Sequence, residues 1–193
     1  MKKILALLLA AVMVLSMAAC GNNANTDETQ ATEATETAAS ALEILETIWA
    51  KYGEDEKFAI IGGNMESAVD GAPGNYDMAY AENMTYNLLI PADQIANITE
   101  AASMIHMMTA NTFTAGVFHL AEGVAAADFA ATMQSAVQNN QWICGFPETL
   151  VIAAIGGEYV LVAFGINDAM TPFQTHLSEV YPDAEVLYNE AIG

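Results

Sequence analysis

The chain has 193 residues, with four Lys, no Arg and 24 Asp and Glu, which gives a formal net charge of −20. From Phe58 to the C-terminus there is no Lys or Arg at all. Binding to nucleic acid requires cationic groups that replace phosphate counterions, so the composition excludes a nucleic-acid partner. It also excludes anionic ligands clamped by Arg, and it opposes adhesion to anionic lipid headgroups.

The N-terminus has the pattern of a secretory signal peptide. A basic start, Met1–Lys3, precedes an apolar run over 4–15 that is shorter than the roughly 20 residues needed to span a bilayer. The following residues, 16–21 (SMAACG), resemble a lipobox, the site where bacterial signal peptidase II cleaves before a lipid-modified cysteine. Met17 replaces the Leu that is most often found three residues before that cysteine. The alternative is a plain secretory signal in which Cys20 is incidental.

The lipobox resemblance implies that residues 1–19 are removed and that Cys20 carries a thioether-linked diacylglycerol. Two acyl chains anchor a protein stably, so we expect a lipoprotein on the outer, extracellular face of the cell membrane. Loss of Lys2 and Lys3 changes the formal charge to −22. Residues 20–40 have no large apolar side chain and are expected to form a disordered, acidic, Thr-rich tether.

Residues 41–193 suit a single domain and are numerous enough to bury a core. Cys144 is the one cysteine left in this segment, so no intramolecular disulfide is possible. Because basic neighbours that would activate a thiolate are nearly absent, we expect Cys144 to be a small buried apolar side chain.

Apolar residues recur at helical spacing twice in the first half of the domain. The first stretch ends at Gly53, a natural helix stop. The second begins after Pro91, carries Ile98 and Ile105 on one stripe, and ends in an apolar run, Met104–Met108, which we expect to be buried or in an interface. The expected elements are a helix over 41–52, a mostly irregular segment over 53–80, a strand over 83–90 and a helix over 91–108.

The second half alternates regularly between strands and helices. Gly156-Gly157 is typical of a two-residue hairpin turn, and Thr171-Pro172 is typical of a helix start, which Pro182 would end. The order β-α-β-β-α-β favours an α+β domain with a ferredoxin-like core over about 113–190, preceded by additional helices. The expected elements are strands over 113–120, 150–155, 159–164 and 184–188, with helices over 124–138 and from 171.

Two expected strands, 150–155 and 159–164, are apolar at every position. A ferredoxin-like sheet has helices on one face, and a face in water would show alternation. We therefore expect the second face to be covered, most simply by the helices at 41–52 and 91–108. The alternatives are a second protomer, which would make a homodimer through the sheet face, or a ligand.

Two segments, Met104–Gly116 (MIHMMTANTFTAG) and Gln141–Pro147 (QWICGFP), followed by the apolar hairpin, resemble a family of uncharacterised lipoproteins from anaerobic Gram-positive bacteria. The similarity covers roughly 95–190 together with the signal peptide. The family carries no known activity, so the resemblance implies the membrane address and no catalytic residue.

The best candidate for a metal site is the oxygen-rich segment 70–77 (DGAPGNYD), although no EF-hand pattern is present. Asp70 and Asp77 are the expected ligands of a weak calcium site, and a simple surface turn is the alternative. His106 among three Met residues suggests copper, but on a helix its ring would point away from them, so we expect the Met side chains to pack in the core.

No nucleophile elbow, zinc-protease motif or phosphate loop occurs, so we expect neither a catalytic residue nor a cofactor. Trp142, Phe146 and Tyr159 could form an aromatic surface for peptide or glycan, or could be core residues. The leading hypothesis is a membrane-anchored, non-enzymatic domain that binds a protein, a glycan or another ligand. The alternatives are a weak calcium-binding protein and an uncharacterised enzyme.

Overall fold

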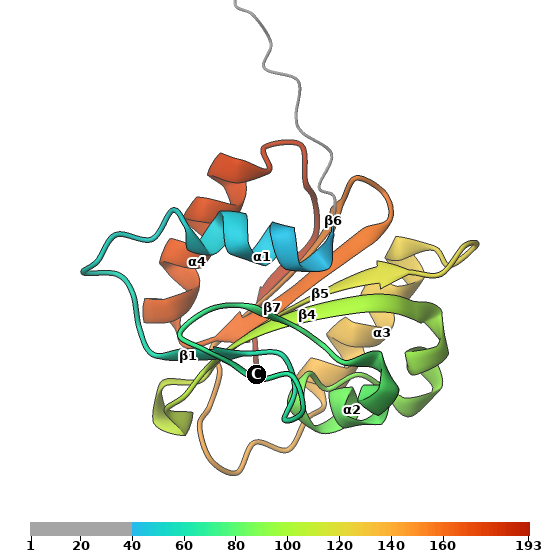
Figure 1. Ribbon diagram of the computed structural model, residues 1–193, viewed down its shortest axis with the longest axis horizontal. Helices are drawn as coiled ribbons and strands as arrows, with labels where there is room; N and C mark the ends of the chain where they lie inside the picture. Colours follow the sequence, from blue (N-terminus) through green and yellow to red (C-terminus); the bar gives the residue numbers. More distant parts are fainter. Residues whose placement is uncertain (1–39) are drawn as a thin grey trace, which may run out of the picture. The chain divides into compact units, whose positions relative to one another are not determined.

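The computed structural model describes residues 40–193. The predicted signal peptide, Cys20 and all but the last residue of the predicted tether lie outside the described residues. Within them, an antiparallel sheet of eight strands carries helices on both faces, so the predicted α+β class is confirmed (Figure 1). No helix of this segment is long and apolar enough to cross a bilayer.

The sheet runs in the order β2-β1-β4-β5-β7-β6-β8, with the short β3 paired to β4. The edge strand β8 has mostly exposed or half-buried side chains, whereas β5, β6 and β7 are almost wholly buried. The strands are β1 (Ile60–Gly62), β2 (Val69–Asp70), β3 (Gly74–Asn75), β4 (Ile98–His106), β5 (Phe113–Leu120), β6 (Thr149–Ile155), β7 (Tyr159–Gly165) and β8 (Glu185–Ala191).

Four α-helices and three 3-10 helices complete the described segment. The predicted helices over 41–52 and 124–138 are confirmed, with small changes at their ends. Ser40 caps the first of them, because its hydroxyl accepts a hydrogen bond from the Glu43 N–H at 3.1 Å. The helices are α1 (Ala41–Trp49), η1 (Met78–Asn83), α2 (Met84–Asn87), η2 (Ala92–Asn97), η3 (Thr109–Asn111), α3 (Ala126–Gln138) and α4 (Asn167–Val180).

From β5 to β8 the elements follow the predicted β-α-β-β-α-β order, but the sheet does not have the ferredoxin-like strand order. There the last strand would lie beside the first. Here β8 pairs with β6, and the position beside β5 is occupied by β4. As a result β5 and β6 are parallel with β7 between them, and β7 and β8 are parallel with β6 between them.

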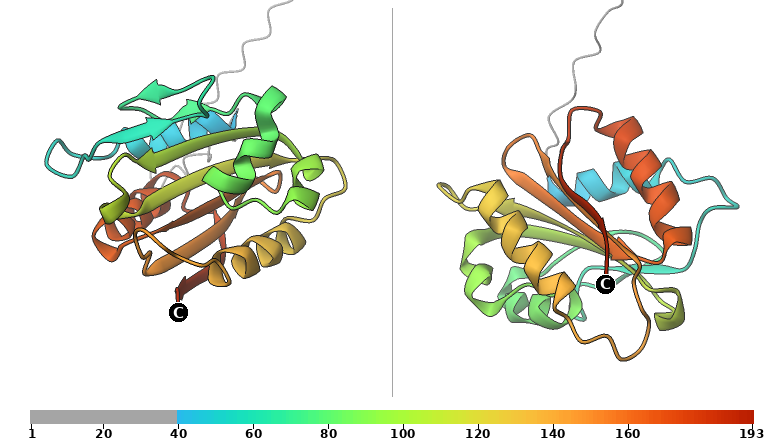
Figure 2. Two further views of the ribbon diagram at one scale, coloured as in Figure 1. Left: turned by 90° about the horizontal axis from the view of Figure 1, so that it is seen from below. Right: turned by 180° about the vertical axis from the view of Figure 1, so that it is seen from behind.

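This strand order places α3 and α4 on opposite faces of the sheet (Figure 2). Crossovers between parallel strands are right-handed, and these two step across the sheet in the same direction from strands that run in opposite directions. Phe129 of α3 packs in one core cluster with Ile152, while Phe173 of α4 packs in the other with Val151. α1 joins α4 on its face.

The apolar runs in β6 and β7 are therefore covered on both faces by the chain's own elements. α1 covers part of the second face, as predicted, and α4 covers the rest. A second protomer is therefore not needed to cover either face of this sheet. The turn between the two strands is the predicted one, because Gly156 and Gly157 both have positive φ, of 62° and 80°.

The predicted helix over 91–108 is wrong. Residues 92–97 form the 3-10 helix η2, and Ile98–His106 forms the central strand β4. Because other elements of the chain cover both faces of this strand, Ala101, Ala102, Ser103 and Met104 are all fully buried, and the alternation that would have revealed a strand is missing.

Two smaller predictions are also wrong. Residues 83–90, expected to be a strand, contain α2, which Met84 anchors in the core. α4 begins at Asn167, not at Thr171, so Pro172 lies inside the helix and the Thr171 hydroxyl donates to the Asn167 carbonyl at 2.8 Å. The start of α4 is held instead by Glu148, whose carboxylate accepts the Asn167 N–H at 2.8 Å.

Replacement of Phe173 by Ala should lower the free energy of unfolding by about 3–5 kcal/mol. Phe173 is fully buried, and its ring lies 5.3 Å from that of Phe113, so truncation leaves a cavity beneath α4. Urea denaturation measures the change. The matched control is Ile143→Ala, which should change stability by less than about 0.5 kcal/mol because Ile143 is 85% exposed.

Candidate functional site

A surface groove of about 440 Å³ lies between the segment after β1 and helix α2. Its wall combines apolar side chains with three carboxamides and contains no charged residue. That is unusual for a chain with 24 acidic residues. The lining residues are Ile61, Gly63, Asn64, Met65, Ala68, Asn83, Tyr86, Asn87 and Ile105.

Glycines shape the wall that follows β1. A Cβ on Gly62 would overlap the backbone of Gly74, and a Cβ on Gly74 would lie 2.8 Å from the Gly62 carbonyl carbon. Gly63 has φ of 74°, a conformation that other residues rarely adopt. Its carbonyl accepts a hydrogen bond from the hydroxyl of buried Ser103 at 3.1 Å. The segment after β1 can therefore turn tightly over β4, and room for the groove remains below this segment.

Asn64 holds this wall in place. Its side chain is 3% exposed, and its Oδ1 accepts hydrogen bonds from the backbone N–H and the hydroxyl of Ser67, at 3.2 and 2.5 Å. Its Nδ2 donates to the Asp77 carbonyl at 3.2 Å. One carboxamide thus links the loop 64–67 to the start of η1, as expected for a buried polar group whose hydrogen bonds are satisfied.

The opposite wall is α2. Met84 is fully buried, and its carbonyl accepts the N–H groups of Leu88 and Ile90 at 2.9 and 3.2 Å. Leu89 between them has φ of 58°, a left-handed conformation that costs a branched residue about 1 kcal/mol or more. The packing of its buried neighbours must outweigh this cost, so α2 is held in a defined position.

The two walls each present one large exposed side chain. Met65 is 83% exposed and Tyr86 is 81% exposed, and they flank the groove from different elements. Ile61 and Ile105, on neighbouring strands, provide the apolar floor. Such a surface can bind the apolar part of a ligand while the carboxamides of Asn83 and Asn87 orient its polar part. Its lining contains no Ser, Thr, Cys, His, Lys, Asp or Glu side chain.

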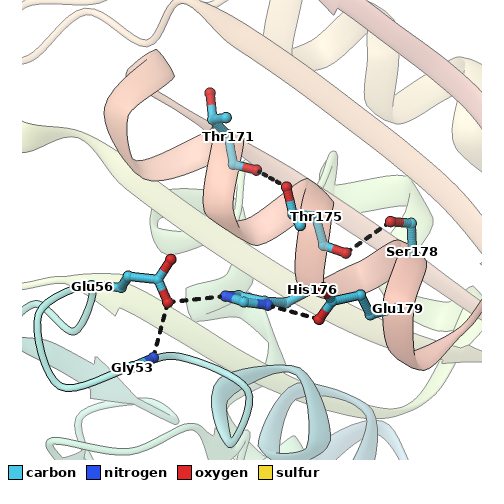
Figure 3. Close-up of polar contacts among 7 residues, drawn as sticks. All are labelled: Gly53, Glu56, Thr171, Thr175, His176, Ser178 and Glu179. Carbon is cyan, nitrogen blue, oxygen red and sulfur yellow. Dashed lines mark hydrogen bonds and ion pairs between the residues drawn. The ribbon is translucent and has the colours of Figure 1, made fainter.

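A second cluster of polar side chains surrounds His176 on α4 (Figure 3). Its Nε2 lies 3.3 Å from Oε2 of Glu56, and its Nδ1 lies 3.2 Å from Oε2 of Glu179. Glu56 also accepts the Gly53 N–H at 2.9 Å. This backbone hydrogen bond, followed by the hydrogen bond and charge of His176, holds the pKa of the Glu56 carboxyl below its usual range.

Next to this cluster, the ring of Tyr52 lies 4.8 Å from that of His176. The Tyr52 hydroxyl is buried and has no hydrogen-bond partner among residues 40–193, and burial, with a smaller effect of Glu56, raises its pKa far above the ordinary value. His176 itself is 8% exposed, which leaves a substrate little access. We interpret the cluster as a structural link that fastens the 53–57 loop to α4.

The residues predicted for calcium are used differently. Asp70 ends the exposed strand β2, opposite Ile61 in the register. Asp77 caps η1, since its Oδ1 accepts the Ala79 N–H at 2.9 Å. Among residues 40–193 no group of three or more His, Cys, Asp or Glu side chains could hold a metal ion. The weak calcium site stays a prediction.

The helical argument about His106 was wrong, because the residue lies on β4. Its Nδ1 accepts the Met108 N–H at 2.9 Å and its ring stacks on Phe58, with 4.8 Å between ring centroids. Met104 packs in the core as expected, whereas Met107 and Met108 are 53% and 58% exposed in the turn that follows the strand.

Of the two alternatives for the aromatic residues, core packing holds for Trp142 and Tyr159, and the three do not form a common surface. Trp142 packs on Phe164 near the end of β7, and Tyr159 is buried at the opposite end of that strand. Phe146 is 67% exposed in the loop after α3. Cys144 lies in the same loop and is exposed, so the prediction of a buried thiol was also wrong.

Comparison with protein-family models, with curated proteins and with solved structures finds no match. The groove was missed by the sequence analysis because its walls, residues 61–68 and 83–87, are brought together by tertiary packing. The local indications were the sequence Gly62-Gly63-Asn64 and the carboxamides four residues apart at Asn83 and Asn87.

Acid should destabilise the protein in part through Glu56. Because its pKa in the folded state is lowered, the ionised carboxylate stabilises the fold at pH values above the ordinary pKa of about 4.3, and this contribution is lost as the pH falls through the lowered value. Glu56→Gln should reduce the melting temperature at neutral pH and should make it less sensitive to pH between about 5 and 3.

Thermal melts followed by circular dichroism across this pH range test the prediction. The control is Glu54→Gln, because Glu54 is 93% exposed and pairs only with Lys57 at the surface. If the Glu56→Gln and Glu54→Gln profiles coincide, the link through His176 does not stabilise the fold.

Proposed function

We propose that this chain is a lipoprotein held at the outer face of the cell membrane through Cys20, and that its domain is a non-enzymatic binding module. The lipobox-like residues 16–21 and the resemblance to uncharacterised Gram-positive lipoproteins support the address. The observation that carries the binding role is the uncharged groove between Met65 and Tyr86, with its ordered walls.

Anchoring is tested with the full-length chain in a bacterial host fed with alkyne-labelled palmitate. The wild-type chain should incorporate the label and remain in the membrane fraction, because Cys20 is the acylated residue. Cys20→Ser should incorporate none and should be found in the medium. Cys144→Ser is the matched control and should behave as wild type. Label retained by Cys20→Ser would refute the anchor.

Ligand binding in the groove is tested by a fragment screen read by amide chemical shifts. Fragments should shift the resonances of 61–68 and 83–87 more than those of any other segment. Tyr86→Ala should abolish these shifts while changing the free energy of unfolding by less than about 0.5 kcal/mol, because the side chain is exposed. Phe146→Ala, which removes another exposed aromatic residue, should leave binding unchanged.

Two results would contradict the proposal. Fragments that gather elsewhere on the surface would remove the groove as the binding site. Turnover of substrates from a hydrolase panel by the purified protein, lost on mutation of a described residue, would show that the domain is an enzyme.

A further inference from the structure

Two carboxylates are next in sequence to residues that line the uncharged groove. Glu66 directly follows Met65 on one wall, and Glu82 directly precedes Asn83 on the other. Both are exposed, and neither forms an ion pair among residues 40–193. The two Lys of this segment, Lys51 and Lys57, stand outside the lining of the groove.

Both carboxylates act on Tyr76, a buried residue that is hydrogen-bonded to a lining residue of the groove. Tyr76 is buried beside it, and its hydroxyl accepts a hydrogen bond from Nδ2 of Asn87, a lining residue, at 3.1 Å. Burial raises the pKa of Tyr76, and the negative charges of both Glu66 and Glu82 raise it further. The charges of both carboxylates therefore act on the hydroxyl to which Asn87 donates.

The groove thus has an apolar floor, and the residues next to its walls include two carboxylates, the rim residues Glu66 and Glu82, that form no ion pair among residues 40–193. An anionic ligand would be repelled there. A bare metal ion would find too few ligands, because no metal-binding group of side chains is present in the described segment. A positive charge would be attracted, and the exposed ring of Tyr86 offers a cation–π contact while the thioether of Met65 offers a polarizable one.

We propose that the groove binds a small organic ammonium ion, with its apolar part on Ile61 and Ile105 and its cationic group within reach of the Glu66 and Glu82 carboxylates. This inference rests on the proposed binding function and names its ligand class. The volume of the groove, about 440 Å³, is in the range of small-molecule sites.

Three probes of similar size distinguish the effect of the ligand's charge on binding from that of its shape. They are benzylammonium, benzyl alcohol and benzoate. The protein is the chain from residue 20 onward with Cys20→Ser, which contains both core clusters completely. Titrations are followed by the amide resonances of 61–68 and 83–87. Benzylammonium should bind more tightly than benzyl alcohol, and benzoate should cause no shift. Added NaCl should weaken binding of benzylammonium only.

The double variant Glu66→Gln/Glu82→Gln should raise the Kd of benzylammonium about five-fold and leave that of benzyl alcohol unchanged. Its matched control is Glu122→Gln/Glu185→Gln, which removes the same charge from exposed positions outside the groove. The control should change neither Kd. Melting curves confirm that both variants remain folded.

Benzylammonium and benzyl alcohol could bind with equal affinity, as read at the amides of 61–68 and 83–87, and the rim variant could change neither Kd. That result would overturn the ammonium assignment but would not contradict the proposed binding function. A rim variant and a control that weaken benzylammonium equally would show general electrostatic attraction, and would also overturn it. If no probe shifts residues 61–68 or 83–87, the assignment fails, and the fragment screen decides separately whether the groove binds other ligands.

Discussion

The arrangement of the last strand and of the helices on the two faces of the sheet depends on the pairing of β4 with β5. Because β4 occupies the place beside β5, the last strand is directed to the other side of the sheet, next to β6. Two right-handed crossovers that step in the same direction then leave one helix on each face. The apolar character of β6 and β7 at every position follows, since each residue meets either α3 or the layer formed by α1 and α4.

The same strand also supports the groove. Ser103 and Ile105 both lie on β4. The Ser103 hydroxyl donates a hydrogen bond to the Gly63 carbonyl, and Ile105 forms part of the groove floor. Gly62 and Gly74 approach each other closely because neither carries a side chain. The segment after β1 can therefore fold over β4. The groove is thus part of the packed sheet, which explains how short segments without long helices or strands can keep a defined cavity.

The second half of the domain was predictable because its elements have strong local patterns. β6 and β7 are continuous apolar runs joined by Gly156-Gly157, and α3 has a clear apolar face. β4 was not predictable in the same way, because Ala, Ser and Met buried on both faces have the spacing of a helix as readily as that of a strand. Cys144 was misplaced for a related reason. The lack of basic neighbours argued against a reactive thiol but contains no information on burial, and Cys144 lies in an exposed loop with Ile143.

The open edge at β8 has a consequence for the encounter of two copies of the domain. An unpaired strand is a template on which another strand can add. β8 carries Glu185 near one end and Glu190 near the other, and its register with β6 shifts between Ile152 and Ala153. In antiparallel pairing of two such edges, each carboxylate would approach a carboxylate of the second copy, and the irregular strand would fit poorly. This edge therefore disfavours growth of the sheet by addition of a second copy.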